Sequence, residues 1–122
     1  MHKVFVCGPP RSGKTTFSRR LGAELGVPVI HTDDYIGSTS FKDAPDAVIK
    51  SLPYSYVVEG VQAARIVRKL IESGLDAKSK VYYLTSNYGR TPNQEPMAIG
   101  IRKIWRGLKP QLLQRGVHVE EL

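Results

Sequence analysis

A short stretch near the start of the sequence constrains the fold of this chain more than any other feature. Gly8, Gly13, Lys14 and Thr15 stand at the spacing G-x-x-x-x-G-K-[ST], here in the segment GPPRSGKT. The apolar run KVFVC precedes this segment, and an amphipathic run, KTTFSRRLGAEL, follows it. A motif of this kind between a strand and a helix is typical of a phosphate-binding loop. We therefore predict a strand, a phosphate-binding loop and a helix in this part of the chain.

Two prolines, Pro9 and Pro10, occupy the first half of the loop and have no N–H group to donate. A phosphate is held by consecutive backbone N–H groups and by the positive end of the following helix. Residues 11–16 keep their N–H groups, so we expect the loop to bind phosphate despite the prolines. Lys14 is expected to supply charge to the β- and γ-phosphates, and the Thr15 hydroxyl is a predicted Mg²⁺ ligand. The predicted nucleotide-binding residues are Gly8, Arg11, Ser12, Gly13, Lys14, Thr15 and Thr16.

Short runs rich in Val and Tyr alternate with amphipathic runs along the chain. The predicted strands are 3–7, 27–31, 55–59 and 80–84, and the predicted helices are 14–25, 43–50 and 61–73. In the second of these helices, Asp43 is expected to cap the first turn and Pro45 to occupy it. A long helix is expected from Met97, with a kink or a restart near Lys109 because of Pro110. The segment VHVEE is a candidate fifth strand.

Alternating strands and helices with short connections predict an α/β fold, with a parallel sheet and helices on both faces. The length of 122 residues fits one domain that spans residues 1–122. No apolar run reaches the ~20 residues needed to cross a bilayer, so we expect no membrane partner. Cys7 is the only cysteine and cannot form an internal disulfide, so a cytoplasmic location is expected.

The formal net charge of +7 favours a polyanionic partner such as a nucleotide or a nucleic acid. GTPase switches usually carry an N-K-x-D motif, which this sequence lacks. Ring and motor ATPases need more elements than 122 residues provide. The classes that remain are a small phosphotransferase and a nucleotide-binding module.

Two aspartates follow the second predicted strand in the segment HTDDY. In a doubly wound sheet the ligand crevice lies beyond the carboxyl ends of the strands, which places Asp33 and Asp34 near the γ-phosphate. Transfer of a phosphoryl group to a hydroxyl needs a carboxylate that orients and deprotonates that hydroxyl. Catalysis is the favoured role for this pair, and a simple turn after the strand is the alternative.

Glu59 ends the third predicted strand, in the segment YVVEG. A carboxylate at this point can hold a metal-bound water opposite Thr15. The alternative is an acidic residue favoured by the dipole of the helix that follows. We therefore predict Thr15 and Glu59 as the metal site.

Together, GPPRSGKTT, TDDY and VVEG resemble the small P-loop kinases, which include polynucleotide kinases, nucleoside kinases and relatives of adenylate kinase. TDDY is similar to the R-D-D-Y of phage polynucleotide kinase, in which the first Asp is the general base. The resemblance implies Asp33 as the base and Glu59 as a metal-linked acid. It also implies a P-loop NTPase fold with a five-stranded parallel sheet in the order 2-3-1-4-5, and ATP and Mg²⁺ as cofactors.

The chain departs from this pattern at Ile36, where polynucleotide kinase has an arginine, and in its short acceptor-binding segment, about 36–53. The C-terminal part is similar to kinase-like proteins of tailed bacteriophages, some of which phosphorylate hydroxymethylated bases in DNA. A phage origin would place the protein in the host cytoplasm.

Small kinases bring arginines onto the phosphates when a lid closes. Arg90, in the predicted lid loop 85–96, is the candidate for this role and completes the predicted catalytic set of Asp33 and Lys14. The predicted acceptor-binding residues are Asp34, Tyr35 and Arg65. Aromatic side chains such as Tyr88 could stack on a base or pack in the periphery of the core.

The sequence as a whole predicts an enzyme, a P-loop kinase that uses ATP and Mg²⁺ to phosphorylate a hydroxyl. A nucleic acid or nucleoside is the favoured acceptor, with a polynucleotide or modified-base DNA kinase as the favoured form. One alternative is a small-molecule or nucleoside monophosphate kinase. The other is a nucleotide-binding or slow ATPase module that acts through a partner.

Overall fold

The computed structural model describes residues 1–37 and 39–122 of the chain. Residue 38, which belongs to the predicted acceptor-binding segment, lies outside the described residues. The strands are β1 (Lys3–Cys7), β2 (Val29–His31), β3 (Tyr56–Glu59), β4 (Lys80–Tyr83) and β5 (His118–Glu121). They form a five-stranded sheet in the order β2-β3-β1-β4-β5, with every pair of neighbours parallel. The predicted α/β class and strand order are confirmed.

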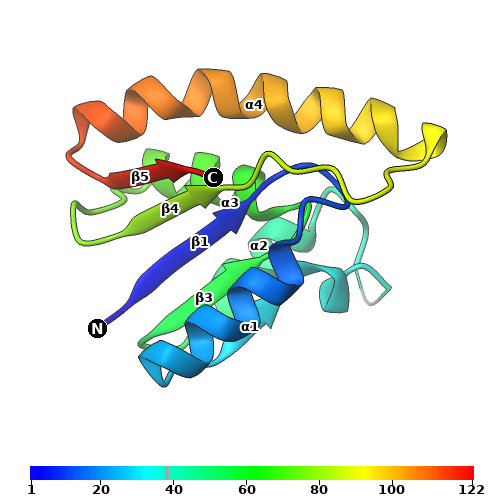
Figure 1. The fold of residues 1–122 in the computed structure, drawn as a ribbon. Helices are drawn as coiled ribbons and strands as arrows, with labels where there is room; N and C mark the ends of the chain where they lie inside the picture. The colour runs from blue at the N-terminus through cyan, green and yellow to red at the C-terminus, as the bar shows by residue number, and fades with distance from the viewer. Residues whose placement is uncertain (38) are drawn as a thin grey trace.

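The helices lie on both faces of this sheet (Figure 1). They are α1 (Lys14–Leu25), α2 (Ala44–Ser51), α3 (Ala63–Glu72) and α4 (Glu95–Gln114), with short 3-10 turns η1 (Thr32–Tyr35) and η2 (Pro92–Gln94). On one face, Phe5 and Cys7 pack with α2, α3 and α4 in the larger core cluster. On the other face, Val4 and Val6 pack with apolar side chains of α1 in a smaller cluster. Alternate residues of β1 therefore fill two separate cores, as expected for a strand buried on both faces.

Helix α4 continues through Pro110 without interruption, so the expected restart near Lys109 is wrong. Pro110 is exposed, while Leu108 and Leu112 on either side of it are fully buried. Burial of these side chains keeps the helix intact although one backbone hydrogen bond is lost. Asp43 occupies the N-cap position of α2 but makes no capping bond with its side chain. Its carboxylate instead accepts a hydrogen bond from the Ser40 hydroxyl at 2.8 Å.

The connections of the sheet determine where a ligand can approach. Helix α1 leaves the end of β1 toward one face, and α3 follows β3 toward the other face. Because β1 and β3 are neighbours, their carboxyl ends flank a crevice of the kind where ligands bind in open α/β sheets. Among the described residues, no helix is both long and apolar enough to cross a membrane.

Candidate active site

The loop between β1 and α1 contains residues with a positive φ, a feature of anion-binding turns. Arg11 adopts a left-handed conformation, with φ of 59°, which turns the chain in front of α1. Gly8 lies so close to Leu84, the residue after β4, that a Cβ atom at position 8 would stand 2.8 Å from the carbonyl oxygen of Leu84. The loop is therefore closed tightly against the sheet, and α1 begins at Lys14 directly behind it.

The two prolines of the loop act as hydrogen-bond acceptors. The Nζ of Lys14 donates to the carbonyl oxygen of Pro9 at 2.7 Å, and the Nε of Arg90 donates to that of Pro10 at 3.0 Å. Burial lowers the pKa of the Lys14 ammonium, while the charges of Glu59 and Asp33 act in the opposite direction. The prolines thus cost the loop two donors but supply carbonyls that orient two cations.

Glu59 lies at the carboxyl end of β3 and is almost fully buried, with 4% of its surface exposed. Its Oε2 accepts a hydrogen bond from the Thr15 hydroxyl at 3.4 Å, which joins the third strand to the phosphate loop. Its Oε1 lies 2.6 Å from Nδ1 of His31. His31 and Glu59 are register partners on the neighbouring strands β2 and β3, which explains this second contact. Sequence reasoning named Glu59 but missed His31 as its partner.

Gly60 allows the segment after β2 to approach β3. Its φ is 135°, and a Cβ atom at this position would overlap the hydroxyl of Thr32. Thr32 is fully buried, and the next residue, Asp33, is exposed at the crevice. The pairing of Gly60 with Thr32 therefore brings Asp33 and Glu59 to the same opening.

A cavity of about 380 Å³ unites the phosphate loop with these acids. Its lining residues are Pro10, Arg11, Gly13, Lys14, Thr15, Thr16, Asp33, Glu59, Gly60, Val61 and Gln94. The structure thus brings together most of the residues predicted to bind nucleotide and metal, and the predicted base. Gln94 is distant from the phosphate loop in the sequence. It falls within the predicted lid loop, 85–96, but was not itself among the predicted site residues.

The three predicted acceptor-binding residues do not line this cavity. Asp34 is exposed next to Asp33 in η1. The hydroxyl of Tyr35 is 2.6 Å from that of Ser51, at the end of α2. The guanidinium of Arg65 lies over the ring of Phe41, 5.2 Å from its centroid. Tyr35 thus contacts the end of α2, and Arg65 contacts the segment that precedes α2.

A second cavity, of about 600 Å³, lies on the other side of the phosphate loop. Ser12 lines it together with Arg11, Gly13, Thr16, Phe17, Arg20, Leu84, Ser86, Tyr88 and Leu122. Tyr88 packs its ring next to Gly13, and its backbone N–H donates to the carbonyl of Arg11 at 2.8 Å. Apolar and aromatic walls with a few polar groups are typical of small-ligand sites.

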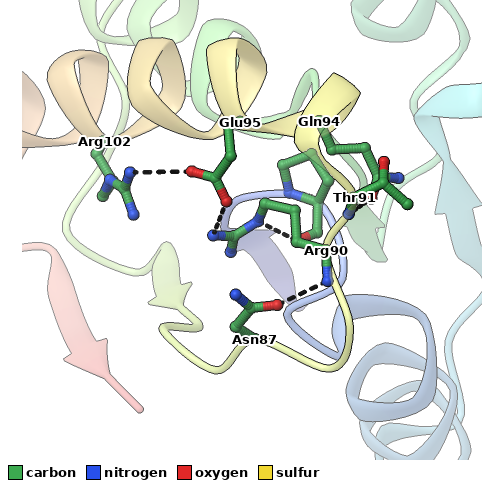
Figure 2. A network of polar contacts seen from close by, with 7 residues as sticks. Asn87, Arg90, Thr91, Gln94, Glu95 and Arg102 are labelled. Atoms are coloured by element: carbon green, nitrogen blue, oxygen red, sulfur yellow. Dashed lines mark hydrogen bonds and ion pairs between the residues drawn. The ribbon is translucent and has the colours of Figure 1, made fainter.

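Arg90 is held in a network of polar contacts (Figure 2). Only 4% of its side chain is exposed, and besides Pro10 its guanidinium contacts Glu95, with Nη1 3.4 Å from Oε1. The other carboxylate oxygen of Glu95 is 4.0 Å from Arg102. The Asn87 side chain accepts the backbone N–H of Arg90 at 2.8 Å. Arg90, the predicted lid arginine, therefore contacts the phosphate loop at Pro10 in this structure.

The donor set of the cavity suits Mg²⁺. This ion prefers hard oxygen ligands, and it is commonly bound by one or two carboxylates together with substrate phosphates. The Thr15 hydroxyl and the Glu59 carboxylate are adjacent, and Asp33 lines the same space. Within residues 1–37 and 39–122, no group of three or more His, Cys, Asp or Glu side chains could hold a metal ion alone. The residues thus fit a metal that shares its coordination with phosphates.

Comparison with known proteins supports the fold. No family model matches the chain, and no curated protein matches it in sequence. Among solved structures, shikimate kinase from Acinetobacter baumannii in complex with shikimate is similar with a TM-score of 0.58 and 17% identity, over 98% of this chain and 82% of that chain. Shikimate kinase from Bacteroides thetaiotaomicron is similar with a TM-score of 0.53 and 14% identity, over 98% and 84%.

The YorR protein from Bacillus subtilis, in complex with phosphorylated GDP, is similar with a TM-score of 0.53 and 19% identity, over 98% of this chain and 85% of that chain. At these identities the likeness establishes the fold alone, which this chain shares with the shikimate kinases and the YorR protein. The more specific resemblance to bacteriophage DNA kinases finds no support in these comparisons.

Proposed function

We propose that this protein is a phosphotransferase that moves the γ-phosphate of ATP, with Mg²⁺, to a hydroxyl of a small molecule. The observation that supports this proposal is that Lys14, Thr15, Asp33 and Glu59 line one cavity, although they lie in three separate segments, at the start of α1, in η1 and at the end of β3. A cation for the phosphates, a hydroxyl and a carboxylate for a metal, and a further carboxylate near both are the groups that phosphoryl transfer requires.

In this proposal each group has a separate task. The loop N–H groups and Lys14 bind the phosphates, and Asp33 accepts the proton of the attacking hydroxyl. Thr15 and Glu59 hold Mg²⁺, which when bound neutralises charge on the phosphates. Arg90 supplies charge next to the loop. The cavity beside Tyr88 receives the base of the nucleotide, because it adjoins the same loop and has aromatic and apolar walls.

A small acceptor is favoured by the size of the cavity that contains Lys14, Asp33 and Glu59, here called the reaction cavity. Its volume of about 380 Å³ lies at the low end of the usual range for small-ligand sites, and it must also accommodate the terminal phosphate. The structural relatives include a shikimate kinase in complex with shikimate, which is a small molecule.

A nucleic acid or nucleoside acceptor is the second candidate, and the net charge of +7 favours it. In that case Asp34, Tyr35 and Arg65 would bind the acceptor at the rim of the cavity. Binding of a nucleic acid would weaken steeply with added salt, whereas binding of a small neutral acceptor would not.

Transfer of labelled γ-phosphate from ATP onto a panel of acceptors tests the proposal. The panel contains small hydroxy acids, nucleosides, nucleoside monophosphates, 5′-hydroxyl oligonucleotides and DNA with hydroxymethylated bases. Label on a small acceptor that disappears in Lys14→Ala would support the proposal. Label on DNA alone would favour the second candidate, and label released only as phosphate would indicate a nucleotide-binding or ATPase module.

A further inference from the structure

The segment that joins β4 to α4 is attached to the phosphate loop at two consecutive carbonyls. The backbone N–H of Tyr88 donates to Arg11 at 2.8 Å, and the Nε of Arg90 donates to Pro10 at 3.0 Å. Tyr88 and Arg90 therefore fix the chain on both sides of Gly89, next to the loop that precedes α1. Glu95 adds a third constraint because it pairs with the buried guanidinium of Arg90 at the first turn of α4.

These attachments place Gln94, the residue before α4, on the wall of the reaction cavity. Gln94 lines this cavity together with Pro10, Lys14 and Asp33. Its side chain is half-buried and belongs to the short turn η2, whose neighbours appear in Figure 2. A residue far along the chain thus faces the space where the terminal phosphate would lie.

The hydrogen bonds of Gln94 determine which end of its amide is available. Its Oε1 accepts the backbone N–H of Thr91 at 2.9 Å. The other end of the amide is therefore the NH₂ group, which can only donate. Within the described part of the chain, the structure records no partner for this Nε2 atom. A donor with a fixed orientation and no partner is suited to bind an oxygen that arrives with a ligand.

We propose that Gln94 is a substrate-contacting residue whose Nε2 donates to an oxygen of the transferred γ-phosphate. This inference rests on the proposed use of a nucleoside triphosphate. A phosphate oxygen is an acceptor that carries charge, and hydrogen bonds to such acceptors are stronger than those between neutral groups. Lys14 and Thr15 contact the phosphate from the loop side, and Gln94 contacts it from the side of α4. This bond forms only with a triphosphate, so it would raise the affinity for ATP relative to that for ADP.

The test compares the binding of AMP-PNP, an ATP analogue that is not hydrolysed, with the binding of ADP, both with Mg²⁺, by calorimetry. The variant is Gln94→Glu, which keeps an oxygen for the Thr91 N–H but replaces the NH₂ donor with a carboxylate oxygen. We expect AMP-PNP to bind about tenfold or more weakly, and ADP to bind within about twofold of the original protein. Gln94→Met removes the donor without adding charge, and a selective loss of about three- to tenfold is expected.

Asn93→Asp is the matched control, because it adds one negative charge to the same turn at an exposed side chain. It should change the ratio of the AMP-PNP and ADP affinities by less than about twofold. An equal loss of both affinities in Gln94→Glu, or no loss of either, would overturn the inference, because it would indicate a purely structural role. The same holds if Asn93→Asp reproduces the selective loss.

The outcome is separate from that of the proposed function. A selective loss of AMP-PNP binding in a protein that phosphorylates no acceptor would support the contact and reject the transferase. Phosphate transfer with an unchanged affinity ratio would reject the contact and support the transferase. If the original protein bound neither nucleotide, both proposals would fail.

Discussion

The two sides of the reaction cavity differ in how they are built. On the phosphate side, the continuous segment 8–16 forms the binding loop. All of the predicted nucleotide-binding residues except Gly8 line one of the two cavities. On the acceptor side, Tyr35 and Arg65 contact Ser51 and Phe41 instead of the cavity. A phosphate site depends on local backbone geometry, which a short motif specifies. An acceptor site depends on packing between distant elements, which a motif does not specify.

Among changes on the phosphate side, the largest effect is expected from Lys14→Ala. The side chain is buried next to the cavity and orients its ammonium on the carbonyl of Pro9. Its loss should lower the rate of phosphate transfer about 10²- to 10³-fold, because a fixed charge near the developing negative charge disappears. Transfer of labelled phosphate measures the effect. Lys50→Ala, which removes an exposed lysine on α2, is the control, and an equal effect there would contradict the comparison.

The metal site should give the next largest effect. Glu59→Gln removes the carboxylate charge beside Thr15 but keeps the size of the side chain. We expect the Mg²⁺ concentration at half-maximal activity to rise about 10- to 100-fold. Activity measured across a Mg²⁺ titration tests this, with Glu72→Gln on the exposed face of α3 as the control. An unchanged Mg²⁺ dependence would remove Glu59 from the proposed metal site.

Gly60 lies where the two sides of the cavity meet, and its substitution should lower the stability of the protein. In Gly60→Ala the new methyl group would overlap Thr32, and its φ of 135° is unfavourable for alanine. We expect the free energy of unfolding to fall by about 1–3 kcal/mol. Denaturation by urea measures it.

Gly100→Ala is the matched control for this change, because nothing lies within 4 Å of a Cβ at that helical position. It should leave stability unchanged or raise it by about 0.5–1 kcal/mol. Similar values for the two variants would show that the contact between Gly60 and Thr32 does not constrain the site.

The smallest effect is expected on the acceptor side, from Arg65→Ala. This change removes the contact with Phe41, which is worth about 0.5–1 kcal/mol for a partly exposed pair. We expect the KM for the acceptor to rise about two- to fivefold, with nucleotide KM unchanged within about twofold. Steady-state kinetics with each substrate varied in turn measures both, and Arg68→Ala, at an exposed position of the same helix, is the control. A loss of nucleotide affinity in Arg65→Ala would erase the difference between the two sides.

Much of the fold follows from local patterns. Helix α1 and strand β1 have the predicted bounds, Lys14–Leu25 and Lys3–Cys7, because a strand, a loop motif and an amphipathic run follow one another directly. The restart at Pro110 was wrong because burial of neighbouring leucines outweighs the local preference of proline. The sheet order came from the resemblance and not from periodicity, which does not specify which strands pair.

The prediction of the site shows the same division between local patterns and long-range contacts. Lys14, Thr15, Asp33 and Glu59 were predicted because each lies just beyond the end of a strand or within a motif. The contact of His31 with Glu59 depends on the register between β2 and β3. The position of Gln94 depends on hydrogen bonds of Tyr88 and Arg90 to the phosphate loop. Neither arrangement leaves a pattern in the sequence, since both depend on residues far apart in the chain.

Two adjacent aspartates allow the most direct test of the account, since only Asp33 lines the reaction cavity and Asp34 is exposed beside it. The measurement is phosphate transfer by Asp33→Asn and Asp34→Asn, with the nucleotide affinity determined on the same samples. We predict that Asp33→Asn lowers transfer about 10²- to 10⁴-fold at unchanged nucleotide affinity, as for loss of a general base. Asp34→Asn should stay within about threefold. Full transfer by Asp33→Asn, or an equal loss in Asp34→Asn, would contradict the proposed site.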